Sequence, residues 1–365
     1  MTMRAATSPV QRPNDARLLI VDRDGRIAQR PRTAFADLLR HSDCVIANDA
    51  ATLPASLSAI HVRSGAIVEV RLAGHASLAA DAMTRFSAIV FGAGDFHTPT
   101  EARAAPPTLR AGDRLSFGEQ RATIMRVLGP MRFVELRFDG DAAQVWRTLA
   151  QYGKPVQYAH LQEPLALWDV WTPIAAQPVA FEPPSAGFML DWRTVAALRA
   201  RDVPFATLTH AAGLSSTGDA ALDARLPLDE PYRIPVATAA LVEATHARGG
   251  RVVAIGTTVV RALEHAARID GIVRAGDGLA TQRIGPHTRL RAVDVIVSGT
   301  HEPDSSHYAL LRAFASGATL ARVTATLEAN AYRTHEFGDS MWIERDAHAT
   351  PACDACAEVA SIDDV

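Results

Sequence analysis

The sequence predicts an α/β main domain that carries an inserted small antiparallel β-barrel domain. In the second half of the chain, short apolar strands alternate with helices, which is typical of a sheet covered by helices. Between about residues 63 and 151, by contrast, short strands follow one another between Gly, Pro and Asp turns. We therefore expect residues 1–62 and 152–345 to form the main domain, residues 63–151 the inserted domain, and residues 346–365 a loose tail.

Hydrophobic periodicity and turn residues predict the individual elements of both domains. In the main domain, strands are expected at residues 16–22, 44–48, 203–209, 251–255 and 292–298. Helices are expected at residues 31–39, 192–201, 235–248, 257–264, 306–314 and 320–332, and a last short element at 337–344. In the inserted domain the predicted strands are 66–72, 88–92, 114–117, 122–127 and 133–138, followed by a helix at 141–151.

The composition is that of an ordinary globular chain, with 48% hydrophobic and 21% charged residues among 365. A formal net charge of −3 gives no overall basic field of the kind that nucleic-acid-binding proteins carry. Lys154 is the only lysine, and the other Lys/Arg residues are arginines. Arginine is a better partner for phosphate and carboxylate than lysine is. No apolar run is long enough to cross a membrane, the first sixteen residues lack the core of a secretory signal, and three cysteines are too few for a disulfide scaffold. We therefore expect a cytoplasmic protein.

Residues 251–264, which read RVVAIGTTVVRALE, predict a ligand site. A Val- and Ile-rich run ends at Gly256, after which apolar residues recur at helical spacing, and Thr257 is positioned to cap the helix. A strand that passes directly into a helix leaves free backbone N–H groups and a positive dipole end at its carboxyl edge. Open α/β sheets bind ligands at this edge, so an anionic or carboxylate-bearing ligand is expected there.

Three predicted strands of the second half end in polar loops. The loops contain His210 and Gly213, then Gly256-Thr257-Thr258, then His301 and Ser305. If the strands are parallel neighbours, all three loops open at one edge of the sheet. Histidines and hydroxyls beside a helix N-terminus are suited to binding a polar ligand and moving a proton. A single histidine at a strand end is more often structural than functional, so each loop alone allows either a structural or a functional role for its histidine.

Two arginines each allow two interpretations. Arg261 and Glu264 lie three residues apart on one helical face, where they either form a surface pair worth about 0.3–0.5 kcal/mol or place Arg261 above the ligand. Arg333 precedes the turn-forming pair Gly338-Asp339, so Asp339 either closes a turn or shapes the site together with Arg333.

Metal-ligand spacing occurs only in the tail. Cys353-x-x-Cys356, with His348 five residues earlier, has half the spacing of a zinc site. No second cysteine pair is present, since Cys44 lies alone in an apolar strand, and we expect no metal site. The sequence also contains no P-loop and no glycine-rich dinucleotide fingerprint.

Several motifs follow one another along nearly the whole chain. IGTTVVRALE at residues 255–264 matches the pattern G-T-T-x-x-R-x-L-E. Further motif stretches are RLLIVD at 17–22, NDAATLPASL at 48–57, SAGF at 185–188, THAAG at 209–213, THEPDSS at 300–306 and YRTHEFGDSM at 332–341. In this order they resemble the motifs of the S-adenosylmethionine:tRNA ribosyltransferase-isomerases of queuosine biosynthesis.

The resemblance implies a monomeric cytoplasmic enzyme with an α/β main domain and an inserted β-barrel. It implies S-adenosylmethionine as a ribosyl donor and, as the acceptor, the aminomethyl-deazaguanine at the tRNA wobble position. In the family's reaction the sulfonium acidifies the ribose C5′ proton, a base removes it and adenine leaves. The aminomethyl group attacks, methionine leaves, and the epoxycyclopentane of epoxyqueuosine remains on the tRNA. The resemblance implies no metal.

The sequence departs from the family pattern in the loops expected to touch the acceptor. Met189 stands where the family has a histidine, and a thioether cannot take a proton. Leu214-Ser215-Ser216 replaces Gly-Thr-Phe, Thr334-His335 replaces two aromatic residues, and residues 153–160 lack most prolines of the pattern G-H-x-P-L-P-P-Y-I. Because the Gly256 signature is intact, we expect a divergent paralogue that still binds S-adenosylmethionine. Modified tRNA is the default acceptor; a small-molecule acceptor and a non-catalytic RNA- or ligand-binding relic are the alternatives.

The motifs and the resemblance together assign roles to named residues. His210 and His301 are the candidates for the general base or for the acid that assists adenine departure. The candidates for binding S-adenosylmethionine are Gly187, Gly213, Gly256, Thr257, Thr258, Arg261, Ser305, Arg333 and Asp339. Among these, the Gly256-Thr257-Thr258 turn is expected to hold the methionine carboxylate or the ribose, and Arg261 to supply positive charge.

Overall fold

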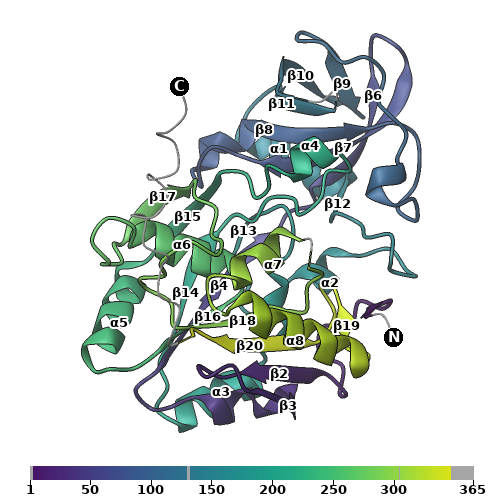
Figure 1. Cartoon of the computed structure of the whole chain (residues 1–365). Helices are drawn as coiled ribbons and strands as arrows, with labels where there is room; N and C mark the ends of the chain where they lie inside the picture. Colours follow the sequence, from purple (N-terminus) through teal and green to yellow (C-terminus); the bar gives the residue numbers. More distant parts are fainter. Residues whose placement is uncertain (1–2, 130–131, 304, 347–365) are drawn as a thin grey trace, which may run out of the picture.

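The main domain is built on a nine-stranded mixed sheet with the strand order β17-β15-β14-β4-β16-β18-β20-β2-β3 (Figure 1). The structure is a computed structural model that describes residues 3–129, 132–303 and 305–346. Four central strands run parallel: β14 (Phe205–His210), β4 (Cys44–Asn48), β16 (Val252–Ile255) and β18 (Val295–Gly299). The outer strands are β17 (Gly276–Ala280), β15 (Glu230–Ile234), β20 (Ser340–Glu344), β2 (Arg17–Val21) and β3 (Ile27–Pro31).

Helices cover both faces of this sheet because its central strands are apolar on both sides. In β16, Val252 and Ala254 belong to the core on one face, while Val253 and Ile255 belong to the core on the other. The first face packs against α5 (Val236–Ala247), α6 (Thr257–Ala266), α7 (Ser306–Leu311) and α8 (Gly317–Ala329). The second packs against the 3₁₀ helices η1 (Arg32–Leu38) and η4 (Ser185–Met189) and against α3 (Trp192–Ala200).

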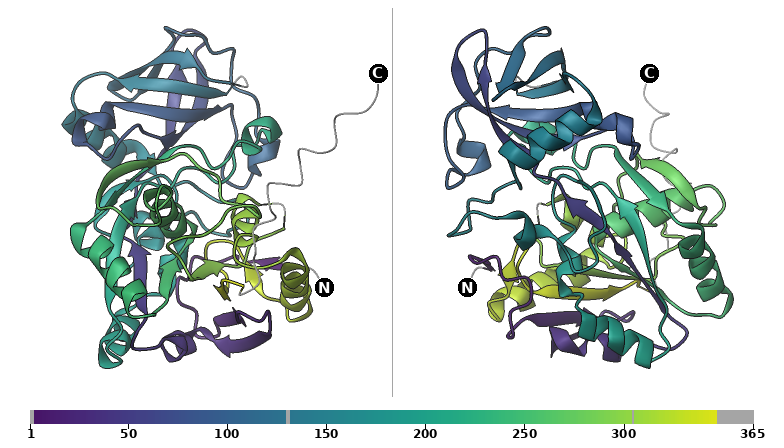
Figure 2. Two further views of the ribbon diagram at one scale, coloured as in Figure 1. Left: turned by 60° about the vertical axis from the view of Figure 1, so that its left-hand side comes forward. Right: turned by 180° about the vertical axis from the view of Figure 1, so that it is seen from behind.

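The second domain is a closed antiparallel barrel, which lies above the main sheet in Figure 1 and in both views of Figure 2. Its strands are β6 (Ser56–His61), β7 (Ala66–Gly74), β8 (Arg85–Phe91), β11 (Phe133–Phe138), β10 (Gln120–Val127) and β9 (Arg114–Phe117), and β9 pairs back with β6 to close it. Phe86, Phe117 and Phe138 help to fill its interior. The helix α1 (Ala142–Tyr152) leads out of the barrel, and Asp141 and Gln144 form a capping box at its start.

Short elements connect and flank these two parts. Two small parallel pairs join β1 (Arg4–Ala5) to β19 (Arg333–Thr334) and β5 (Ala50–Thr52) to β13 (Gln177–Ala180). The remaining elements are η2 (Ala80–Thr84), η3 (Thr100–Ala102), β12 (Gly153–Lys154), α2 (Leu167–Val170) and α4 (Ala220–Asp223).

The predicted fold class, an α/β main domain with an inserted β-barrel, is confirmed. The strand pairing assigns β6 to the barrel sheet, so this sheet begins at Ser56, before the boundary expected at residue 63. The sequence pattern also missed β3, β15 and β17, which lie in the outer, antiparallel parts of the main sheet. These strands contain Pro, Gly and charged residues that break the apolar pattern by which strands are recognised.

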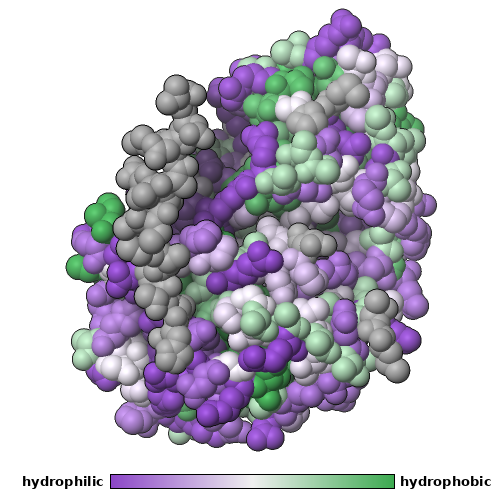
Figure 3. Space-filling model, viewed as in Figure 1, coloured by the Kyte–Doolittle hydropathy of each residue, from purple (hydrophilic) through white to green (hydrophobic). Residues whose placement is uncertain are grey.

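Hydrophilic and hydrophobic residues are interspersed over the face in Figure 3. Of the helices formed by the described residues, none is both long and apolar enough to cross a membrane. His348, Cys353 and Cys356 lie outside the described residues.

Candidate active site

The polar loops that follow β14, β16 and β18 open at the same edge of the main sheet. β14 and β16 both pair in parallel with β4, and β18 pairs in parallel with β16. The carboxyl ends of these strands therefore lie at one edge of the sheet. The strands are parallel, as the prediction of three converging loops required. Ligands of open α/β sheets bind at this edge.

A cavity of about 560 Å³, called here the larger cavity, lies between this edge and the barrel. Arg71 of β7 and Thr100 of η3 line it from the barrel, and His301 and Ser305 line it from the loop after β18. Other walls come from the segments around Tyr158, Glu182, Ser215 and Glu336. Its volume is in the range of about 300–1,000 Å³ that small-molecule and cofactor sites occupy.

A smaller cavity of about 60 Å³ adjoins the larger one, since Ser215 and His307 line both. Four of the predicted cofactor-binding residues line the smaller cavity, namely Gly213, Thr257, Thr258 and Arg261. The structure therefore brings together residues from the loops after β14 and β16, as the sequence predicted.

The helix α6 begins at Thr257 beside the smaller cavity. Gly256 is its N-cap residue and has a φ of +97°, a conformation that favours glycine. Thr257 is thus the first helical residue rather than the cap, and no side chain caps this helix. Thr258 Oγ1 accepts a hydrogen bond from Asn48 Nδ2 at 3.2 Å. The backbone N–H groups of the first turn have no side-chain cap, which suits them to an anionic ligand.

Arg261 lines the smaller cavity with its charge paired. Its guanidinium donates to the Glu230 carboxylate and, at 2.9 Å, to the Ala280 carbonyl oxygen. Glu264 instead accepts from the backbone N–H groups of residues 291–293 at 2.7–3.0 Å. Both side chains are buried and have separate partners, so the interpretation as an Arg261–Glu264 surface pair was wrong.

The two candidate histidines occupy different environments. His301 lines the larger cavity, and its Nε2 lies 2.8 Å from Ser298 Oγ. Burial and the neighbouring His307 hold the pKa of His301 well below its usual value, so the ring is neutral. His210 is fully buried, lines neither cavity, and has its Nε2 3.5 Å from Glu230 Oε2. The geometry therefore favours His301 over His210 for direct contact with a ligand.

Arg333 and Asp339 lie behind the wall of the larger cavity and line neither cavity. Asp339 accepts from the backbone N–H groups of Arg17 and Arg333, both at 2.9 Å, and forms ion pairs with both guanidinium groups. Burial works to raise the pKa of Asp339, but these hydrogen bonds and charges hold it below its usual value. The contacts anchor the segment 334–336, whose residues line the cavity.

Gly187 and Met189 also lie outside both cavities. Gly187 is buried in η4, where a Cβ atom would come within 3.0 Å of Thr172. Met189 is 5% exposed and packs in the core with Leu190 and Trp342. The replacement of the family histidine by Met189 therefore falls in the core rather than on the cavity wall.

A group of titratable side chains, of which Glu182 is buried and the others are half-buried, lines the larger cavity and was not predicted from the sequence. Burial raises the pKa of Glu182 to about 7, and burial together with the Glu182 charge raises that of Glu336 to about 8. Burial also raises the pKa of Tyr158 well above its usual value and lowers that of His160 to about 4. Shifts of this kind cluster at functional sites. The four residues come from three separate segments, so the local sequence does not indicate that they meet.

A family model described as "Queuosine biosynthesis protein" matches residues 2–343 of this chain. The chain belongs to the queuosine biosynthesis protein family. One relative, the S-adenosylmethionine:tRNA ribosyltransferase-isomerase of Azoarcus sp. (strain BH72), is 31% identical over 354 residues, which cover 94% of this chain and 95% of the relative. The protein of the same name from Gluconacetobacter diazotrophicus is 32% identical over 350 residues, 93% of each chain.

A solved structure of an S-adenosylmethionine tRNA ribosyltransferase from Thermotoga maritima is also similar. It is 22% identical, with a TM-score of 0.49, over 93% of this chain and 95% of that chain.

Family membership confirms the resemblance that the motifs predicted. The residues that match the family signature, Thr257, Thr258 and Arg261, lie at the smaller cavity. The residues at positions that depart from the family pattern and line the larger cavity are Tyr158, His160, Ser215, Ser216, Thr334 and His335. The signature residues and most of the altered residues thus lie at different parts of the same site.

Proposed function

We propose that this chain is an S-adenosylmethionine-dependent ribosyltransferase-isomerase that modifies tRNA in queuosine biosynthesis and gives epoxyqueuosine. The observation that carries the proposal is the family match across residues 2–343, with the signature residues gathered around adjoining cavities. The same resemblance supports a monomeric enzyme of the cytoplasm.

The smaller cavity suits the amino-acid end of S-adenosylmethionine, whose sulfonium supplies an activated ribose. The backbone N–H groups at the start of α6 would receive the methionine carboxylate. The hydroxyl groups of Thr257 and Thr258 would hold the carboxylate or the ribose, and Ser305 lines the wall of the larger cavity. Arg261 would act partly through Glu230, which it holds against the backbone N–H of Gly213.

In the larger cavity, His301 would remove the ribose C5′ proton. Its position on the cavity wall and its hydrogen bond to Ser298 support this role. Glu182 is suited to protonate the departing adenine, since a pKa of about 7 keeps both protonation states populated near neutral pH. The aminomethyl nitrogen of the acceptor would form the new bond to the ribosyl fragment, and methionine would leave as the epoxide closes.

A small-molecule acceptor is the second candidate, because several residues that line the larger cavity depart from the family pattern and the net charge is −3. The two acceptors differ in their salt dependence. Binding of tRNA releases counterions from phosphates, so its affinity falls steeply with ionic strength. Binding of an uncharged small molecule shows little such dependence.

The test is a mass-spectrometric assay of the purified chain with S-adenosylmethionine, with and without tRNA that carries aminomethyl-deazaguanine. Release of adenine and methionine together with the mass gain on the tRNA nucleoside would establish the proposed reaction. Release of either product without tRNA modification would indicate that the chain uses an acceptor other than tRNA. Saturable binding of S-adenosylmethionine without turnover, unaffected by substitution of His301, would favour the non-catalytic alternative.

A further inference from the structure

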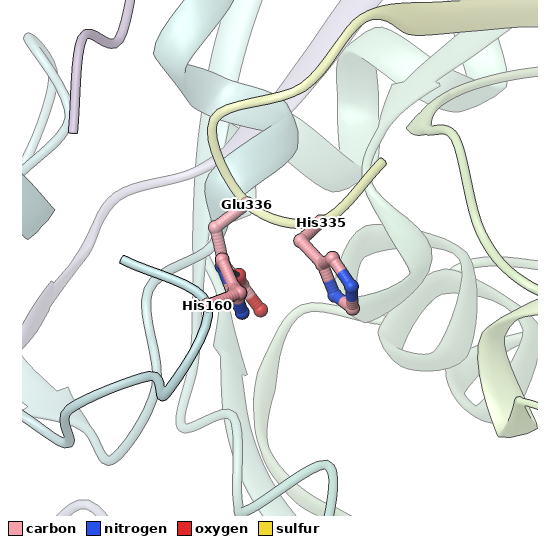
Figure 4. A group of neighbouring side chains, drawn as sticks. All are labelled: His160, His335 and Glu336. Carbon is pink, nitrogen blue, oxygen red and sulfur yellow. Dashed lines mark ion pairs between the residues drawn. The ribbon is translucent and has the colours of Figure 1, made fainter. Parts of the chain in front are cut away.

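His160, His335 and Glu336 bring three potential metal ligands together at the wall of the larger cavity. His160 belongs to the segment after β12, whereas His335 and Glu336 lie between β19 and β20. One ligand atom from each residue lies within 4.8 Å of the other two, and no other such group of three occurs among the described residues. Figure 4 shows the three side chains extending into the same space from two separate loops.

The contacts within this group leave two polar atoms without hydrogen bonds. His160 Nε2 lies 3.6 Å from Glu336 Oε2, and both atoms are buried with no hydrogen-bond partner. The rings of His160 and His335 are stacked, with centroids 4.3 Å apart and planes 16° from parallel. Buried polar atoms nearly always have a hydrogen-bond partner or another ligand. Two unpartnered atoms that lie side by side therefore point to a ligand that both atoms would bind.

A shared cation would satisfy both atoms. Two ligands bound at about 2.1 Å to one tetrahedral ion lie about 3.4 Å from each other. The observed separation of His160 Nε2 and Glu336 Oε2, 3.6 Å, is close to this value. The imidazole of His335 is held beside that of His160, so rotation of its side chain would complete the set.

We propose that His160, His335 and Glu336 bind a divalent transition-metal ion. Two imidazoles and one carboxylate suit ions such as Zn²⁺, Co²⁺ or Ni²⁺, whereas Mg²⁺ and Ca²⁺ prefer oxygen ligands throughout. Three protein ligands leave a coordination position open on a tetrahedral ion. Because all three residues line the larger cavity, that position is within reach of a molecule bound there.

This site goes beyond the proposed reaction, which uses no metal. It also differs from the half zinc motif of the tail, and it departs from the expectation that the chain binds no metal. His160 and His335 stand at positions where the sequence departs from the family pattern, so the site is a property of this chain's own residues.

The test uses the full-length chain after removal of metal with a chelator. A background variant, His348→Ala/Cys353→Ser/Cys356→Ser, removes the potential ligands of the tail. Titration with Co²⁺ is followed in the visible spectrum, which reports the coordination of the ion, and titration with Zn²⁺ by calorimetry. The proposal predicts that the background variant binds one equivalent of either ion.

Substitutions in the same background then locate the ion. Glu336→Gln and His160→Ala should each weaken Co²⁺ binding by about tenfold or more. His307→Ala is the matched control, because His307 is another histidine that lines the same cavity but lies outside the group of three. It should bind Co²⁺ as the background variant does, and thermal unfolding checks that each variant is folded.

Two results would overturn the proposal. The first is that the folded background variant, which lacks the tail ligands, binds no Co²⁺ or Zn²⁺, a result that needs no substitution in the cavity. The second is that His307→Ala weakens binding as much as Glu336→Gln does.

Discussion

Arg261 and Glu230 form a buried ion pair that joins α6 to β15 beside the smaller cavity. Their side chains are only 4% and 9% exposed. Arg261 also donates to the carbonyl oxygens of Leu228 and Ala280, and Glu230 accepts from the backbone N–H of Gly213 at 2.6 Å. The pair therefore connects the helix that begins at the ligand-binding edge with the loop that follows β14.

Substitution of Arg261 by alanine should destabilise the fold strongly, because it leaves the Glu230 carboxylate buried without its partner. We expect the free energy of unfolding, measured with guanidinium chloride, to fall by about 3–5 kcal/mol. Arg233→Ala is the matched control, since it breaks the exposed pair with Asp277 and should cost about 1 kcal/mol or less. Equal costs for the two variants would show that burial of the Arg261 pair has no special weight.

His301→Ala should act on turnover rather than on the fold. Loss of a general base lowers the rate by about 10²–10⁴-fold, and adenine release at saturating S-adenosylmethionine measures it. His210→Ala should instead lower the free energy of unfolding by about 0.5–3 kcal/mol, because His210 is a buried side chain that lines neither cavity. Unchanged adenine release by His301→Ala would remove His301 from the catalytic role.

Met189→His should not restore a family-like catalytic group. The imidazole would enter the core beside Leu190 and Trp342, where a polar group without a partner costs about 1–3 kcal/mol. Met189→Leu, which keeps the volume and the apolar character, should cost less than about 1.5 kcal/mol. Denaturant unfolding compares the two variants, and the assay of adenine release checks their activity. A gain in turnover by Met189→His would mean that residue 189 does reach the reacting atoms.

The pair of His246 and Asp294 should make stability depend on pH near neutrality. His246 Nε2 lies 3.7 Å from Asp294 Oδ2, and this partner raises the pKa of His246 in spite of burial. A raised pKa in the folded state adds stability that is fully present below the unfolded value of about 6.5 and is lost as the pH rises through the folded value. His246→Gln should therefore cost more free energy of unfolding at about pH 5.5 than at about pH 8.5.

Urea unfolding of His246→Gln and of the unsubstituted chain at both pH values measures this difference. His41→Gln provides a control, because no ion pair with a carboxylate is found for His41 in the described part of the chain. An equal cost of His246→Gln at the two pH values would contradict the linkage.

Local sequence was sufficient to predict the fold class and the edge at which the candidate site lies. Apolar strands that end in Gly-Thr-Thr or in a histidine-containing loop can be recognised from a few neighbouring residues. The order of the motifs along the chain identified the family. Parallel pairing of β14, β4, β16 and β18 then brought the loops together, as the pattern required.

Packing alone decided which side chains meet in that site. The partner of Arg261 is Glu230 from a distant strand, although Glu264 lies one helical turn away. Glu182, His160 and Glu336 converge on one cavity from separate segments, and the local sequence of these segments does not indicate that they meet. Hydrophobic periodicity specifies which face of an element is buried, whereas a contact between polar side chains depends on how whole elements pack, and this is decided only in the folded chain.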